Sequence, residues 1–224
     1  MRVYLFAAVI ALLPRTAAAD CDLAGLEAKV LNAGATLPAD GAFIVAAVHQ
    51  GHGKLEPGDI TMHPEWKLHV DGRAIAPKID SIAPGLSLYR VGGKTGTLEL
   101  QDGARKSLAT GKATAASRTP FPAPVVKKLT YSPSGYHRNE AVTAELDGAV
   151  PGGAIAIVMM DDKGTPRSFG LVVAGRPVTP FLHTYCGTLP NGTLGSKPGD
   201  KVKVAWLDEA GRLSPASKVI EIVK

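Results

Sequence analysis

The sequence predicts an all-β protein built from two β-sandwich-like domains in tandem, and three observations predict this class. Apolar and polar residues alternate in short runs rich in β-branched side chains, a pattern typical of half-buried strands. The 224 residues include 25 glycines and 17 prolines, which implies frequent turns. Aromatic residues make up only 5% of the chain. Many turns and few large anchors suit an all-β protein of short strands.

The first nineteen residues predict a secretory signal peptide. Arg2 precedes an unbroken apolar run over residues 3–13, and Ala17-Ala18-Ala19 provides a small-residue cleavage site before Asp20. The apolar run is too short to span a membrane, and no stretch of the mature chain is apolar enough to do so. We therefore expect a secreted or periplasmic protein that is cleaved after Ala19.

A proline-rich segment divides the mature chain. Thr119-Pro120-Phe121-Pro122-Ala123-Pro124 carries three prolines, which favour an extended and semi-rigid connector. We place a signal peptide at residues 1–19, one domain at 20–118, a linker at 119–124 and a second domain at 125–224. The alternative is a proline-rich edge strand inside one large sandwich.

The first domain is expected to begin with a short helix and continue with strands. Within residues 21–32, Leu23, Leu26, Val30 and Leu31 lie near one helical face, with Gly34 after them. The dipeptides Asp71-Gly72, Gly92-Gly93 and Asp102-Gly103 predict tight turns, and the first is a strong hairpin signal. The expected strands are residues 42–49, 67–70, 73–76, 86–91, 95–100 and 105–109.

The second domain is expected to hold seven strands in about one hundred residues, which is the strand count of an immunoglobulin-like sandwich. Alternation within its strands predicts a core that includes Ala156, Val158, Leu171, Val173, Val204 and Trp206. The expected strands are residues 125–131, 141–146, 154–160, 168–173, 178–184, 201–207 and 218–223, and the last two form the closing hairpin.

The stretch from Val204 to Ser217 supports this assignment by resemblance. It reads as an apolar strand ending in Trp206-Leu207, then Asp208, Gly211 and the pair Ser214 and Ser217. This order resembles the end of bacterial fibronectin type III-like modules. The tryptophan typical of the family's second strand is missing from residues 142–146. The resemblance implies a sandwich with an adhesive or spacer role and implies no catalytic residues.

The charge balance argues against a nucleic-acid partner. The formal net charge is +5, and removing Arg2 and Arg15 with the signal peptide leaves 23 basic and 20 acidic residues. The lysines and arginines are scattered, and no basic patch with interleaved aromatic residues appears. A solvated surface explains these charges.

Histidines gather in one region of the first domain. His49, His52, His63 and His69 lie within twenty-one positions, together with Met62. Imidazole binds copper or zinc and thioether binds copper, so these residues are a candidate metal site. Their spacing matches no specific site, and a polar loop on a secreted protein explains them better. We therefore expect no preassembled metal site and assign no cofactor.

No catalytic signature is present. The chain has neither a Gly-x-Ser-x-Gly elbow nor a His-Glu-x-x-His motif. The sequence Gly92-Gly93-Lys94-Thr95 lacks the earlier glycine that a phosphate-binding loop needs, because Leu88 stands there. The carboxylate pairs Asp161-Asp162 and Asp208-Glu209 fall in predicted turns, which explain them without acid–base catalysis.

The two cysteines are expected to form one disulfide. Cys21 and Cys186 are the only cysteines, and the signal peptide sends the chain to an oxidising compartment. Their bond would tie the two domains together. A disulfide-linked dimer and two buried free thiols are the alternatives.

These observations favour a secreted or periplasmic, non-catalytic binding or spacer protein. Its partner would be a protein or a cell-envelope ligand that the sequence does not identify. Two other functions remain open: metal handling in the periplasm through the His49–His69 region, and an enzyme of a kind without a recognisable motif.

Overall fold

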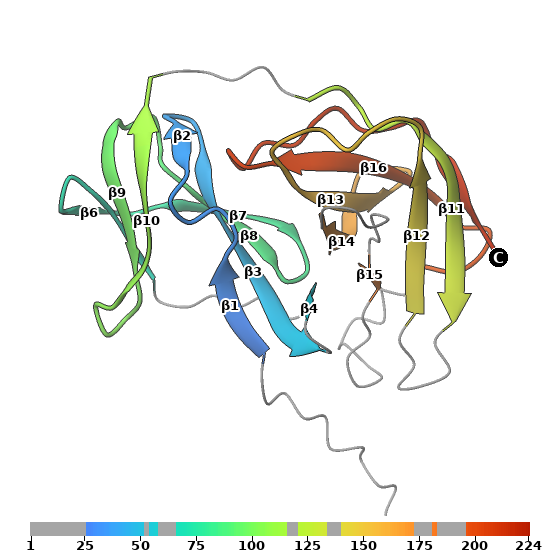
Figure 1. The fold of residues 1–224 in the computed structure, drawn as a ribbon, viewed down its shortest axis with the longest axis horizontal. Helices are drawn as coiled ribbons and strands as arrows, with labels where there is room; N and C mark the ends of the chain where they lie inside the picture. The colour runs from blue at the N-terminus through green and yellow to red at the C-terminus, as the bar shows by residue number, and fades with distance from the viewer. Residues whose placement is uncertain are drawn as a thin grey trace, which may run out of the picture.

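The computed structural model describes residues 26–51, 54–57, 66–115, 121–133, 140–172, 181–182 and 196–224. These ranges are all-β, as the sequence predicts, and they contain no helix that could cross a bilayer. We call the described residues 26–115 the N-terminal half and the described residues 121–224 the C-terminal half. Figure 1 shows the first in blue to green and the second in yellow to red.

The N-terminal half is a sandwich of two sheets. Sheet A has the strand order β1-β3-β8-β7 with β4 paired to β3, and sheet B has the order β2-β10-β9-β5-β6. In chain order these are the A-B-E-D and A′-G-F-C-C′ arrangements of an immunoglobulin-like fold. The strands are β1 (Leu26–Val30), β2 (Thr36–Pro38), β3 (Ala42–Gly51), β4 (Lys54–Pro57), β5 (Lys67–Val70), β6 (Arg73–Ile75), β7 (Lys78–Ala83), β8 (Leu86–Arg90), β9 (Gly96–Gln101) and β10 (Ser107–Thr114).

The strands of the C-terminal half close into a barrel and keep the strand neighbours of an immunoglobulin-like fold. Its strands pair in the closed order β11-β12-β15-β14-β13-β16-β17, and the parallel pairing of β17 with β11 completes the circle. Strand β12 lies between β11 and β15 while β16 lies between β13 and β17, as in an immunoglobulin-like sandwich. The strands are β11 (Val126–Pro133), β12 (Glu140–Leu146), β13 (Ala154–Asp161), β14 (Pro166–Leu171), β15 (Phe181–Leu182), β16 (Lys201–Asp208) and β17 (Ile220–Val223).

The Asp71-Gly72 turn forms the hairpin that the dipeptide predicts. Strand β5 pairs with β6 through Val70 and Arg73, so only two residues separate the strands. Asp71 and Gly72 have φ angles of 48° and 74°, and two consecutive positive values are the requirement of a type I′ turn. The Asp71 carboxylate accepts a hydrogen bond of 2.8 Å from the Thr97 N–H, which ties the hairpin to β9.

The closing hairpin of the C-terminal half pairs over only a short length. Strands β16 and β17 pair at Lys201 with Glu221 and at Val202 with Ile220. Beyond that point the segment 214–217 lies along β16 in place of β17. The N–H groups of Ser214 and Ser217 donate to the carbonyls of Trp206 and Val204, at 2.9 and 2.8 Å.

Sheet A lies between sheet B and the β13, β14 and β16 side of the C-terminal half. On β3, Phe43 and Val45 face sheet B, where they join a buried cluster with Tyr89 and Leu98. The alternate residues Ala42, Ile44, Ala46 and Val48 face the other way and join a buried cluster with β13, β14 and β16. A strand buried on both faces reads as a continuous apolar run, which explains the segment from Ala42 to Val48. We call the interface of sheet A with β13, β14 and β16 the seam.

The predicted N-terminal helix is wrong in its described part. Residues 26–30 form β1, which pairs antiparallel with β3, and Ala28 and Val30 pack against the core between the sheets. A helix of about twelve residues is marginal on its own, and the ladder to β3 together with period-two packing stabilises the strand instead. Residues 21–25 lie outside the described ranges.

Gly92-Gly93 forms the expected turn, but the strands on either side of it, expected at residues 86–91 and 95–100, do not pair as a hairpin. Strand β8 pairs with β3 and β7 in sheet A, whereas β9 pairs with β5 and β10 in sheet B. The turn therefore carries the chain from one sheet to the other. Both edges of β8 are already occupied, in part by β7, which sequence reasoning missed. The exposed residues of β7 do not alternate cleanly with buried ones, because β7 lies at an edge of its sheet.

Four of the predicted core residues of the second domain are buried and Leu171 is partly buried, but they lie on two different faces. Val204 and Trp206 belong to the core of the C-terminal half. Ala156 and Val158 belong to the seam cluster, and Leu171 packs against that cluster. The register shows why, since Ile157 lies opposite Trp206 while Val158 lies opposite Ala205. Val173 lies outside the described residues.

Candidate functional site

The candidate histidines are distributed over two sheets. His49 lies on β3 in sheet A and His69 on β5 in sheet B, while His52, His63 and Met62 fall outside the described residues. Within the described ranges, no three His, Cys, Asp or Glu side chains are placed to hold a metal ion. A complete metal site in the His49–His69 region therefore remains a hypothesis drawn from the sequence.

His69 faces away from the sandwich core. Its neighbours Leu68 and Val70 are buried, so strand alternation puts the imidazole on the outer face of sheet B. Its Nδ1 lies 3.5 Å from the Gly72 carbonyl oxygen, and its Nε2 is buried without a hydrogen-bond partner. Glu99 on β9 is the residue directly opposite. The imidazole therefore points away from sheet A, where His49 lies.

Both cysteines of the expected disulfide, Cys21 and Cys186, fall outside the described residues. The pairing stays a prediction.

The carboxylates of Asp161 and Asp208 organise turns, as the sequence predicts. Asp161 accepts hydrogen bonds from the N–H groups of Lys163 and Thr165, at 3.0 and 2.7 Å. The bond from Thr165 is the main reason that the pKa of the Asp161 carboxyl lies below its ordinary value, and the Arg167 guanidinium lowers it further.

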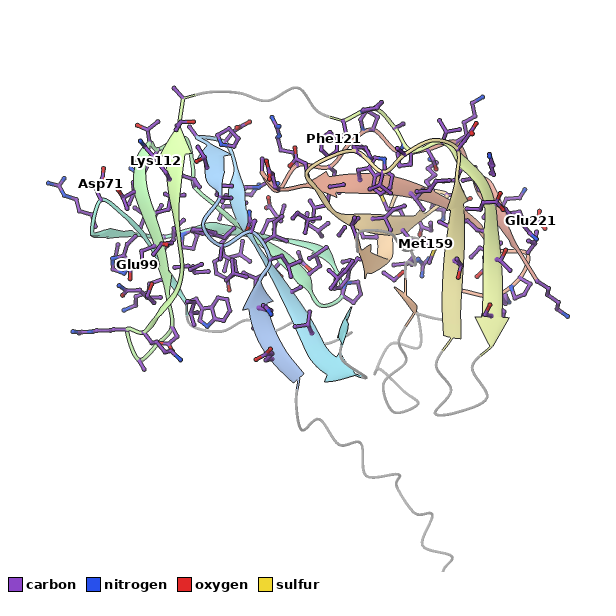
Figure 2. All side chains as sticks on the ribbon, in the orientation of Figure 1. Asp71, Glu99, Lys112, Phe121, Met159 and Glu221 are labelled. Carbon is purple, nitrogen blue, oxygen red and sulfur yellow. The ribbon has the colours of Figure 1, made fainter. Side chains whose placement is uncertain are left out.

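The seam brings together the largest set of side chains from distant parts of the sequence. Ile44, Ala46, Val48, Leu86 and Leu88 of sheet A are buried against side chains of β13, β14 and β16. The facing residues are Ala156, Val158, Met160, Phe169, Ala205 and Leu207. Figure 2 shows side chains filling the space between the two halves. The described residues of this contact form an apolar cluster like that of a protein core.

A polar contact borders the apolar seam. The loop 208–212 follows β16 and directs three consecutive backbone carbonyls at the N-terminal half. The Glu209 carbonyl accepts a hydrogen bond from Asn32 Nδ2 at 2.8 Å. The Ala210 carbonyl accepts one from the Ala42 N–H at 3.0 Å. The Gly211 carbonyl accepts one from Arg90 Nη1 at 3.1 Å. We call residues 208–212 the latch loop.

The two side-chain donors are themselves held in place. Asn32 is buried, donates a second bond to the Ala42 carbonyl and accepts one from the Ile44 N–H, both at 2.9 Å. Arg90 donates from Nε to Asp80 Oδ2 at 2.8 Å. That bond is the main cause that lowers the pKa of the Asp80 carboxyl. Both donors therefore meet the latch loop in a fixed geometry.

Sequence reasoning missed the seam, although one signal was present. The run from Ala42 to Val48 is apolar at every position, whereas a strand with one exposed face should alternate. Asn32 and Arg90 gave no signal, since their partners are backbone carbonyls 177 and 121 positions away, respectively.

No protein family and no curated protein matches this sequence. Among solved structures, a biofilm-associated protein domain is 12% identical and has a TM-score of 0.27, with 89% of this chain and 29% of that one covered. The adhesin domain of Epf from Streptococcus pyogenes is 12% identical at a TM-score of 0.30, covering 84% of this chain and 69% of the other. This chain thus spans under a third of the first structure. The likeness extends to the all-β architecture alone.

A third similar structure is a Ca²⁺-stabilised adhesin with which an Antarctic bacterium binds ice. It is 16% identical at a TM-score of 0.24, and the match covers 89% of this chain and 49% of that one.

Proposed function

We propose that the mature protein is a secreted or periplasmic, non-catalytic binding or spacer module whose two immunoglobulin-like halves are held at one fixed angle. The observation that carries this proposal is the burial of sheet A on both faces. Its strand β3 contributes Phe43 and Val45 to one core and Ile44 and Val48 to the other. Because sheet A contributes side chains to both cores, a rotation or translation of one half against the other would disrupt the packing at the seam.

The fixed angle favours a holding role over catalysis. Enzymes with a site between domains commonly open and close around their substrate. Here the contact between the halves is apolar, and its border is fixed by three hydrogen bonds from Asn32, Ala42 and Arg90. Opening it would expose buried apolar surface and leave polar groups without partners.

The resemblance to fibronectin type III-like modules supports the same role. The residues that carry it, Ser214 and Ser217, bind β16 in the way described above, and both hydroxyl groups accept hydrogen bonds from that strand. The division into domains at residues 20–118 and 125–224, with a linker at 119–124, is part of this proposal. The partner that we propose is a protein or a cell-envelope ligand, and no nucleic acid.

The test measures whether the angle is fixed. Spin labels on non-cysteine synthetic residues at Lys112 and Glu221 would report the distance between halves, since both positions are exposed and lie on opposite sides of the molecule (Figure 2). We expect one narrow distance distribution in the full mature chain. Several distances, or a broad distribution, would overturn the proposal. Stoichiometric copper or zinc binding by the same protein would instead support metal handling.

A further inference from the structure

The latch loop has a shape that an extended strand cannot provide. Successive carbonyls of a strand point in alternating directions, so neighbouring carbonyls cannot serve one surface. In the latch loop the carbonyls of Glu209, Ala210 and Gly211 all accept hydrogen bonds from the N-terminal half. The backbone must therefore turn at this point, and the turn requires stabilising interactions of its own.

Asp208 holds the turn from inside the loop. Its Oδ1 accepts hydrogen bonds from the N–H groups of Ala210 and Arg212, both at 2.9 Å. Its Oδ2 accepts two more from the Arg212 guanidinium, from Nε at 3.1 Å and Nη2 at 3.0 Å. The backbone closes the same loop, because the Asp208 N–H donates to the Arg212 carbonyl at 3.0 Å. Both oxygens of the Asp208 carboxylate thus accept two hydrogen bonds each, and all four donors lie within residues 208–212.

The latch loop and the N-terminal half pack so closely that two glycines at the contact have little space for a side chain. Gly211 has a φ of 75°, and a Cβ at that position would lie 3.0 Å from the Ala42 Cβ. A side chain at Gly41 would lie 3.1 Å from the Ala210 carbonyl oxygen. The two backbones therefore approach closely in one orientation, and larger side chains would hold them apart.

We propose that the Asp208–Arg212 pair is a positioning device that preorganises the latch loop and thereby sets the angle between the two halves. The hydrogen bonds of the carboxylate lie within the loop, so the loop holds its shape before the halves meet. Preorganisation of this kind lowers the cost of ordering on association. The inference rests on the proposed function, because it explains how the fixed angle is kept.

The chain offers a matched control in Asp161. This carboxylate also accepts two backbone N–H bonds in a turn of the C-terminal half and pairs with an arginine, Arg167, at 2.9 Å. Its turn joins β13 to β14 and has exposed residues at 162–165. Asp161→Ala therefore removes the same chemistry from a turn that contributes no hydrogen bond described here to the seam.

The experiment uses the full mature chain with the labels at Lys112 and Glu221. Asp208→Ala is expected to lose the single narrow distance, while Asp161→Ala keeps it. Asp208→Asn, which retains the acceptor and removes the charge, should give an intermediate width and serves if the alanine variant does not fold. Amide spectra should show both sandwich cores intact in every variant measured.

The outcomes distinguish the proposed fixed angle between the halves from the proposed positioning role of the Asp208–Arg212 pair. A narrow distance in the natural sequence that persists in the Asp208 variants would overturn the positioning role and leave the fixed angle standing. Equal broadening by Asp161→Ala would also overturn it, because the effect would then be general loosening of the C-terminal half. A broad distance in the natural sequence itself would defeat the proposed function first.

Discussion

Individual polar side chains organise the backbone at three turns of this protein. The carboxylates of Asp71, Asp161 and Asp208 each accept hydrogen bonds from backbone N–H groups in or beside a turn. Short acidic side chains suit this role because they reach N–H groups a few residues away. Buried apolar side chains also stabilise the fold, and Trp206 is the largest of those described in the C-terminal half.

Trp206→Ala should lower the free energy of unfolding by about 3–5 kcal/mol, as truncation of a buried aromatic residue generally does. The indole is 3% exposed and belongs to the core of the C-terminal half. Urea unfolding of the full chain measures the loss. Val219→Ala is the control, since Val219 is 48% exposed in the same half. A loss in Trp206→Ala no larger than that of the control would contradict the burial of the indole.

Asp80 should make stability depend on pH in the acid range. Its pKa is lowered in the folded protein, chiefly by the hydrogen bond from Arg90. A carboxyl whose folded pKa is depressed contributes stability above its unfolded pKa, and this contribution is lost as the pH falls through the folded pKa. The difference in unfolding free energy between the natural sequence and Asp80→Asn should therefore be largest above about pH 4 and shrink below it. A difference that stays constant across this range would refute the assignment.

At the scale of elements, β16 is completed by a segment that is not a strand. The N–H groups of Trp206 and Val204 donate to the hydroxyl oxygens of Ser214 and Ser217, at 2.9 and 3.0 Å. The two serines donate in turn to the neighbouring carbonyls of Pro215 and Lys218. The Ser-x-x-Ser pattern thus supplies side-chain acceptors where Pro215 interrupts the backbone ladder.

Ser214→Ala and Ser217→Ala should each cost about 1–3 kcal/mol, because each leaves a buried N–H of β16 without its acceptor. Thermal or urea unfolding of the full chain is the measurement. Ser132→Ala on β11 is the matched control, since Ser132 is exposed, and it should change stability by less than about 0.5 kcal/mol. Equal effects at all three serines would show that these hydroxyl groups do not complete β16.

At the scale of the whole molecule, the seam makes the two halves depend on each other. Sheet A separates two apolar clusters, one shared with sheet B and one shared with the C-terminal half. The β13, β14 and β16 side of the C-terminal half therefore packs directly on sheet A, although a proline-rich segment joins the halves. Described residues 121–124 of that segment form no strand, and Phe121 packs against the core of the C-terminal half.

Cutting the connector should not separate the halves. A specific protease site inserted between residues 118 and 119 would break the covalent link, while the apolar seam and its three hydrogen bonds remain. We expect the cut protein to elute as one species under reducing conditions, in which a disulfide cannot hold it together. Two separately eluting halves would contradict a shared core and favour independent domains.

The predicted Cys21–Cys186 disulfide also belongs to this scale. Closing so long a loop would stabilise the protein by about 4–5 kcal/mol in the chain-entropy model, less any strain. Mass analysis of the purified protein without reductant should show the loss of two hydrogens relative to the reduced protein. Two free thiols would exclude the bond and remove its contribution to the fixed angle.

The sequence by itself determined the local features of this protein. Period-two alternation located most strands to within a few residues, as at β5 and β12, and dipeptides such as Asp71-Gly72 located tight turns. These signals are readable because strand and turn geometry depends on residues close together in the chain. The same locality made residues 21–32 ambiguous, since a short apolar segment fits either a helix or a strand until its partner is known.

Only the tertiary structure decided how the sheets stack. Alternation shows that Val158 and Trp206 are buried but does not say against what, and register places them on opposite faces of the same pair of strands. The contacts of the latch loop could not be predicted from the sequence for a related reason. Its partners Asn32, Ala42 and Arg90 meet backbone carbonyls, which every residue carries, so no side-chain pattern in the sequence marks the contact.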